Sequence, residues 1–173
     1  MVEIVQEGNK TLRQIAKEVP VSEITGIKIQ KILKDMSEAL DSQNDGVAIA
    51  APQIDLSLRI FAVSGRVFDK DFMNGDSNFI NAKKHPNLFF INPIITKISK
   101  DKKVMDEGCL SVRPIFGKVR RATRATVEAY NEKGEKFKMN GTGLLAHIFQ
   151  HETDHLEGIL FTDKAKDMRE ILQ

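Results

Sequence analysis

Two histidines and a glutamate in His151-Glu152-Thr153-Asp154-His155 are spaced for metal chemistry. In a helix, residues i and i+4 lie on one face, so both imidazoles can reach one ion. Glu152 lies next to that face, where its carboxylate can reach a water on the metal without binding the metal itself. Apolar residues surround the motif, so the helix is expected to be largely buried, where unpartnered polar side chains are costly. The pattern predicts a metal held by His151 and His155.

A catalytic metal usually has three protein ligands and one open position, so a third ligand is needed. Only 18 residues follow His155, which is little chain for a second ligand-bearing helix. His147 continues the i, i+4 series, but it lies about 12 Å along the helix axis from His155, so three such histidines cannot share one ion.

The single cysteine is the remaining candidate for the third metal ligand. Cys109 lies in the segment Glu107-Gly108-Cys109-Leu110-Ser111, directly after a predicted strand. A thiolate with two imidazoles is a plausible ligand set for Fe(II), Zn(II), Co(II) or Ni(II). A nucleophilic Cys–His pair is the weaker alternative, because it leaves the second histidine and the glutamate without roles.

Rigid elements must position these residues. A helix is predicted from about Gly143 to Glu157, with Thr142 as N-cap and Gly158 just beyond its end. A second long helix is predicted from Ile24 to Leu40 after Ser22 as N-cap, and shorter helices at 11–17 and 163–172.

Strands are predicted at 59–63, at 88–95 with a break at Pro93, and at 126–130 and 135–139 around a hairpin turn at 131–134. The polar segment 64–87 is interpreted as a surface insertion, and the lysine-rich stretch 97–103 as an exposed turn. Strands and helices do not alternate regularly, which favours an α+β fold over a doubly wound sheet.

Length and composition are typical of one globular domain over residues 1–173. The 26 Lys and Arg against 24 Asp and Glu give a net charge of +2, too small to indicate nucleic acid as the main partner. No apolar run reaches the roughly 18 residues of a membrane span, and no signal-peptide pattern opens the chain. One cysteine fits a reducing cytoplasm, so we expect a cytoplasmic protein.

Three segments together resemble the peptide deformylase family. They read GVAIAAPQ at 46–53, EGCLS at 107–111 and QHETDH at 150–155. The corresponding family motifs are approximately G-φ-G-φ-A-A-x-Q, E-G-C-φ-S and H-E-x-D-H, where φ is apolar. The second and third match completely and the first misses one position. The likeness runs from the GNKTLRQIA stretch near the N-terminus to GILF at 158–161, nearly the whole chain.

The resemblance implies antiparallel β-sheets packed around the helix that carries the HExxH motif. It implies hydrolysis of the N-formyl group from the starting methionine of new polypeptides, with release of formate. The ligands would be Cys109, His151 and His155, holding one divalent ion per chain, Fe2+ natively, with Zn2+, Ni2+ or Co2+ as alternatives. Glu152 would act as general acid and base on a metal-bound water, and the Gln53 amide and the Leu110 N–H would stabilise the oxyanion.

The substrate is expected to meet the backbone at Gly46, Val47 and Ala48. Its methionine side chain is expected to enter a pocket lined by Leu144, His147 and Ile148, where the polar His147 would modify selectivity or be a satisfied core residue. Glu107 and Asp154 would either orient the ligands or form surface salt bridges.

The sequence departs from the family pattern at Ala48, Arg113 and Phe116, and these departures are expected to affect the fine substrate preference. Two alternative functions remain open at this point: a catalytically silent homologue that acts as a metal-binding module, and an HExxH metalloprotease. The expected partners are N-formylmethionyl nascent peptides, met by a monomer. A basic cluster is interpreted as a transient ribosome contact or as a solvated strand edge: Lys118, Arg120, Arg121 and Arg124.

Overall fold

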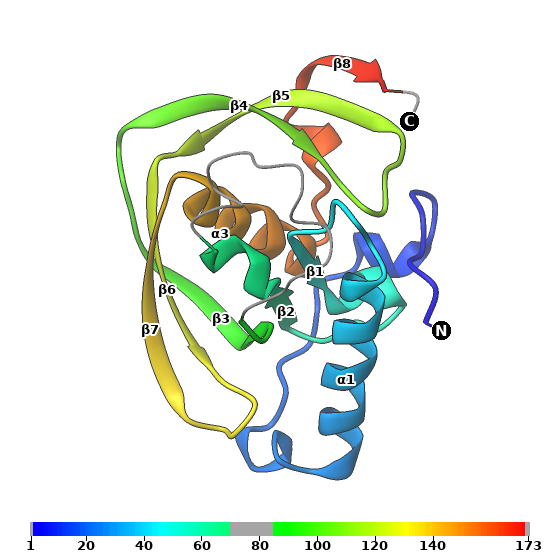
Figure 1. Ribbon diagram of the computed structural model, residues 1–173, viewed down its shortest axis with the longest axis vertical. Coiled ribbons are helices and arrows are strands. Elements are labelled where there is room, and N and C mark those ends of the chain that lie inside the picture. The colour runs from blue at the N-terminus through cyan, green and yellow to red at the C-terminus, as the bar shows by residue number, and fades with distance from the viewer. Residues whose placement is uncertain (1, 70–84, 172–173) are drawn as a thin grey trace.

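The computed structural model describes residues 2–69 and 85–171, and these form two antiparallel sheets and two α-helices (Figure 1). The larger sheet has the order β1-β2-β3-β6-β7 and the smaller one β4-β5-β8. The α+β class with antiparallel sheets is therefore confirmed. Most of the predicted insertion at 64–87 lies outside the described residues.

The strands of the larger sheet are β1 (Ala48–Ala50), β2 (Ile60–Val63), β3 (Leu88–Ile98), β6 (Arg124–Tyr130) and β7 (Lys136–Thr142). Those of the smaller sheet are β4 (Lys102–Gly108), β5 (Ile115–Ala122) and β8 (Lys166–Glu170). The helices are α1 (Ile27–Asp41) and α3 (Gly143–Leu156). Short 3-10 helices cover Lys10–Arg13, Val21–Glu23, Ala51–Ile54, Gly65–Phe68 and Phe161–Asp163.

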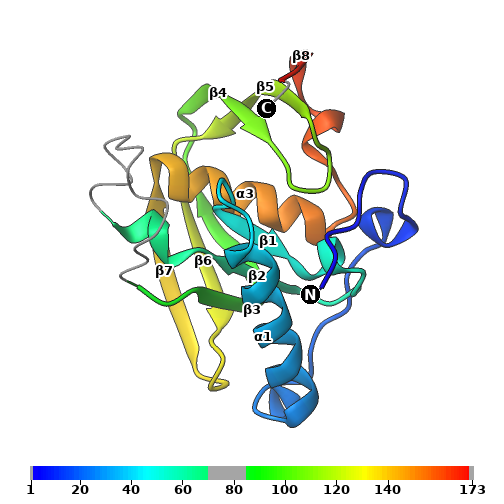
Figure 2. The ribbon, with the colours of Figure 1, turned by 45° about the vertical axis from the view of Figure 1, so that its right-hand side comes forward.

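Helix α3 lies between the two sheets (Figure 2) and contacts strands of both, including β6 and β7 of the larger sheet and β5 of the smaller. It begins after Thr142 as predicted, and Gly158 just beyond its end takes a φ of 72°. The hairpin of β6 and β7 also forms as predicted. The turn predicted at 97–103 is shorter than expected, because β3 continues to Ile98 and β4 begins at Lys102. None of the helices in the described residues is long and apolar enough to cross a membrane.

An aromatic cluster fixes α3 to the larger sheet. Phe61 of β2 and Phe90 of β3 stack with their ring centroids 4.6 Å apart, and the ring of Phe149 from α3 meets Phe90 edge-on at 5.3 Å. All three side chains are fully buried. The orientation of α3, and with it the direction in which its histidines point, is thus set by rings on its opposite side.

The predicted helix starts near the N-terminus were wrong. α1 begins at Ile27 because Gly26 before it has an extended backbone, and Val21–Glu23 forms a separate 3-10 turn. The helix predicted at 11–17 is limited to Lys10–Arg13, since Ala16 donates its backbone N–H to Leu156 and Lys17 donates to Ser57. These hydrogen bonds to distant chain segments hold 16–17 extended.

Strand β3 does not break at Pro93 but continues to Ile98 through an irregularity. Its register to β6 shifts between Ile91 and Ile94, and Asn92 takes a φ of 51°. The Asn92 side chain accepts from the backbone N–H of Val19 at 2.8 Å and donates to the Val19 carbonyl at 2.7 Å. The bulge therefore accommodates Pro93, which has no backbone N–H to donate to the neighbouring strand.

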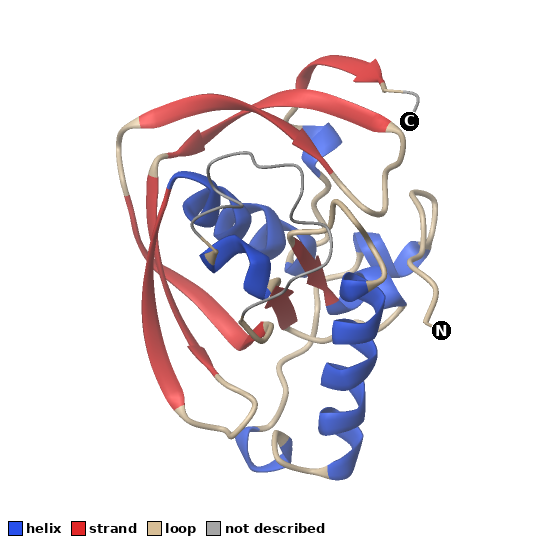
Figure 3. Ribbon diagram, in the orientation of Figure 1, coloured by secondary structure: helices blue, strands red, loops and turns tan. Residues whose placement is uncertain are grey.

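The helix predicted at 163–172 was also wrong. After the 3-10 turn Phe161–Asp163 the chain forms β8, which pairs antiparallel with β5 (Figure 3). Every residue of β8 is exposed, so a helix here would bury no apolar face. Pairing with the open edge of β5 supplies backbone hydrogen bonds instead.

We expect Phe90→Ala to lower the free energy of unfolding by about 3–5 kcal/mol, because it opens a cavity between β3 and α3. Urea unfolding at equal metal content measures the loss. Phe89→Ala is the matched control, since the neighbouring ring lies on the other face of β3 and is only half-buried. Equal losses in the two variants would contradict the assignment of Phe90 to the core that holds α3.

Candidate metal centre

Cys109, His151 and His155 converge as the sequence predicts. Cys109 directly follows β4, and the two histidines lie one turn apart on α3. Their ligand atoms lie within 4.8 Å of one another. The Cys109 Sγ is 3.3 Å from the His155 Nε2, which is 3.2 Å from the His151 Nε2. Such separations suit donors that each lie roughly 2.0–2.3 Å from one ion, so the three residues fit a divalent metal.

Glu107 contacts His151 on the side of the ring that faces away from His155. The carboxylate is only 5% exposed and accepts from His151 Nδ1 and His147 Nε2, and from Arg121 at 2.6 and 3.1 Å. Burial alone raises the pKa of Glu107, but the hydrogen bonds from His147, His151 and Arg121 outweigh it and keep the pKa far below its usual value. Glu107 is thus ionised at neutral pH and orients the candidate ligand His151; the alternative of a surface salt bridge is wrong for this residue.

Arg121 was expected in a basic surface cluster, and this was wrong. Strand β5 alternates, with Lys118 and Arg120 exposed and Val119 and Arg121 buried. Besides Glu107, Arg121 binds Asp154 of α3 at 2.6 Å. The alternation of β5 around the apolar Val119 is the signal in the sequence that could have placed Arg121 inside.

Asp154 connects this buried network to the surface. Its carboxylate accepts from Arg121 and also from Lys164, at 2.7 and 2.8 Å. The side chain therefore contacts Arg121 and no candidate ligand directly, while its ion pair with the partly exposed Lys164 is the surface salt bridge considered as the alternative.

Glu152 is a buried carboxyl next to the ligands. It is 4% exposed, and among the described residues its Oε2 has no hydrogen-bond partner. Burial raises its pKa to about 7, although the nearby His151 acts in the opposite direction. A carboxyl with this pKa can both accept and return a proton near neutral pH.

The His155 imidazole is almost fully buried, and burial together with the adjacent His151 keeps its pKa well below the usual value. His155 is therefore neutral at physiological pH. Neutral imidazole is the form that binds a metal.

Gln53 presents its amide to the same site. Its Oε1 accepts from the Ala50 N–H at 2.8 Å, which turns Nε2 toward Ser111 Oγ at 3.2 Å and Cys109 Sγ at 3.4 Å. Leu110 lies next to the thiol, and its carbonyl is held by Gln6 at 3.0 Å. A side-chain amide and the backbone of 109–111 thus surround one side of the candidate ligands.

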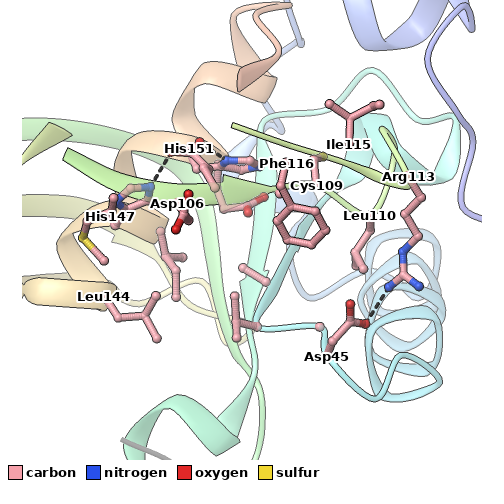
Figure 4. A pocket seen from close by; sticks show the side chains of 18 of the residues that line it. Asp45, Asp106, Cys109, Leu110, Arg113, Ile115, Phe116, Leu144, His147 and His151 are labelled. Carbon is pink, nitrogen blue, oxygen red and sulfur yellow. Dashed lines mark hydrogen bonds and ion pairs between the residues drawn. The ribbon is translucent and has the colours of Figure 1, made fainter. Parts of the chain in front are cut away.

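A cavity of about 270 Å³ opens beside these residues. It is lined by every catalytic, substrate-binding and metal residue that the sequence predicts except His155, which is buried. Figure 4 shows Leu144 and His147 at one end and Asp45 and Arg113 at the other. The sequence analysis missed several lining residues, which only the fold brings here: Asp45, Met105, Asp106, Ile115 and Ile171.

The three departures from the family pattern all line this cavity. Arg113 binds Asp45 at 2.5 Å at one end of the cavity, and both side chains are partly exposed. The Phe116 ring covers Gly108, where a Cβ would come within 2.5 Å of the ring. Ala48 is buried in β1. The departures therefore alter the walls of the cavity and leave the three candidate ligands untouched.

An α+β fold with a buried glutamate and two histidines on one helix, and a cysteine as third donor, defines a metal-dependent hydrolase of the HExxH class. The model of the Polypeptide deformylase family matches residues 1–170. Peptide deformylase from Desulfitobacterium hafniense is 43% identical over 165 residues, covering 95% of this chain and 94% of that one.

Solved structures of peptide deformylases have a similar fold. The Met-Ala-Ser-bound peptide deformylase of Acinetobacter baumannii aligns with a TM-score of 0.81 at 30% identity, covering 95% of this chain and 98% of that one. The deformylase of Thermotoga maritima aligns with a TM-score of 0.79 at 31% identity, covering 96% and 98%. The chain belongs to the peptide deformylase family.

We expect Glu107→Gln to lower the free energy of unfolding by about 3 kcal/mol at pH 7, because it leaves the buried Arg121 without its main counter-charge. Since the pKa of Glu107 is lowered in the folded protein, its contribution is present above pH 4.5 and is lost as the pH falls below that value. The difference between wild type and variant should therefore shrink in acid.

Urea unfolding of the metal-free proteins between pH 7 and pH 3.5 measures this difference. Glu157→Gln is the matched control, because it removes a half-exposed partner of Arg59 and should cost less than about 1 kcal/mol. A pH-independent difference for Glu107→Gln would contradict the account of the network.

Proposed function

We propose that this chain removes the N-formyl group from the N-terminal methionine of newly made polypeptides and releases formate. The observation that carries the proposal is the convergence of three metal donors with a buried glutamate, whose pKa is about 7, beside one cavity. The family membership specifies which amide bond this machinery hydrolyses.

The proposed cofactor is one divalent ion held by Cys109, His151 and His155. We propose Fe2+ as the native ion, with Zn2+, Ni2+ and Co2+ as substitutes, since a thiolate and two imidazoles accept all of them. When bound, the ion lowers the pKa of a water and so supplies a nucleophile near neutral pH.

The residues of the chain carry the proton transfers and hold the substrate. Glu152 takes the proton of the attacking water and gives it to the departing amine as the formyl C–N bond breaks. The Gln53 Nε2 and the Leu110 N–H donate to the formyl oxygen as it becomes negative. Product release leaves Glu152 ready to accept again.

The cavity suits a peptide that begins with methionine. We propose that the backbone of this peptide lies along Gly46, Val47 and Ala48, and that its first side chain enters between Leu144, His147 and Ile148. The Acinetobacter baumannii protein, whose structure holds Met-Ala-Ser, supports this class of ligand. We further propose a cytoplasmic monomer that meets nascent chains through a transient ribosome contact, for which the outward-facing Lys118 and Arg120 are available.

Formate release from formyl-Met-Ala-Ser by anaerobically purified protein tests the proposal. We expect Glu152→Gln to lower kcat/KM by about 10²–10⁴, because it removes the proton carrier, while the metal content stays at that of wild type. Wild-type protein that holds one metal per chain but releases no formate would overturn the proposal and favour a silent homologue.

The oxyanion donors give a separate prediction. We expect Gln53→Ala to lower kcat by about 10²–10³, as is typical when one such donor is removed. Ser111→Ala is the control, because it removes only the acceptor of the Gln53 amide and should cost much less. If Ser111→Ala were as damaging as Gln53→Ala, the loss would reflect disturbed packing and not a missing donor.

A further inference from the structure

His147 is a buried histidine that borders the proposed methionine pocket but takes no part in the proposed proton transfers. It lies one helical turn before His151, is 6% exposed, and lines the cavity between the apolar Leu144 and Ile148. It is outside the group of donors that could share an ion. Burying a polar ring in this apolar wall costs free energy unless the ring is hydrogen-bonded.

The partner of His147 is the carboxylate that also holds His151. Oε1 of Glu107 accepts from His151 Nδ1 and from Arg121 Nη2 at 2.6 Å, and Oε2 accepts from His147 Nε2 and from Arg121 Nε at 3.1 Å. Each oxygen is thus held by one histidine and one arginine N–H. Because both oxygens are held in this way, rotation of the carboxylate about its Cγ–Cδ bond would break these hydrogen bonds.

The contact at Oε1 sets how the His151 ring is turned. Its Nδ1 faces Oε1 of Glu107, so its Nε2 lies on the opposite side of the ring. This Nε2 lies 3.2 Å from the His155 Nε2, within the group of donor atoms that includes the Cys109 Sγ. The orientation of the ligand ring is therefore set by the position of Oε1.

We propose that His147 is a positioning residue for the metal site. By holding Oε2 of Glu107 it fixes Oε1 against His151 and so directs the His151 Nε2 to the point shared with Cys109 and His155. Without His147, Oε2 retains only the longer bond from Arg121, and the carboxylate can turn away from His151. The inference rests on the proposed metal site and adds a residue that acts on a ligand from the wall of the substrate cavity.

The test compares two substitutions by their Co2+ affinity and by the visible absorption of the Co2+-loaded protein. His147→Leu keeps an apolar wall but has no donor, and we expect it to raise the Kd for Co2+ about three- to tenfold, below the 10–100-fold typical for a direct partner of a ligand, and to shift the absorption bands. His147→Gln can place an amide N–H near Oε2, and we expect it to restore both properties to within about twofold of wild type.

Leu144→Val is the matched control, because it alters the same cavity wall without touching Glu107, and it should leave Co2+ affinity and absorption unchanged. If His147→Leu does not fold, His147→Met replaces it as the apolar variant. Wild-type affinity and spectrum in the apolar variant would overturn the inference, and so would an equal loss in His147→Gln. These readouts need no substrate, so they decide the inference even if Co2+-loaded wild type releases no formate, a result that would overturn the proposed function alone.

Discussion

The buried pair of Glu107 and Arg121 is the interaction on which the rest of the site depends. A carboxylate and a guanidinium that are each 5% exposed are stable only if nearly every hydrogen-bonding position has a partner. Glu107 comes from β4 and Arg121 from β5, and their remaining partners come from α3. The requirement to satisfy this charge pair therefore fixes the smaller sheet against the helix.

That attachment brings the candidate metal donors together. Cys109 lies two residues after Glu107, so the same contact that anchors the end of β4 places the thiol beside the His155 Nε2. The aromatic cluster fixes α3 from its opposite side, with Phe149 against Phe90. Helix and strand are each held by interactions outside the donor set, which is the arrangement that keeps ligands in place before a metal binds.

Much of the site could be predicted because its signals are local. The i, i+4 spacing of His151 and His155 depends only on helix geometry, and Cys109 followed from the need for a third ligand. The helix of 143–156 formed as expected because its apolar pattern and the glycine at 158 agree, although the Thr142 side chain makes no capping hydrogen bond. The features that could not be predicted depend on contacts between segments that are far apart in the sequence. The open edge of β5 turned 166–170 into a strand, Ala16 and Lys17 were held extended by remote carbonyls, and Arg121 was drawn inward by Glu107.

X-ray absorption of the metal-loaded protein tests the central claim most directly, that Cys109, His151 and His155 share one ion. The account predicts one sulfur neighbour at about 2.3 Å and two imidazole nitrogens at about 2.0–2.1 Å from a zinc ion. A first coordination sphere without sulfur, or with a single imidazole, would contradict it.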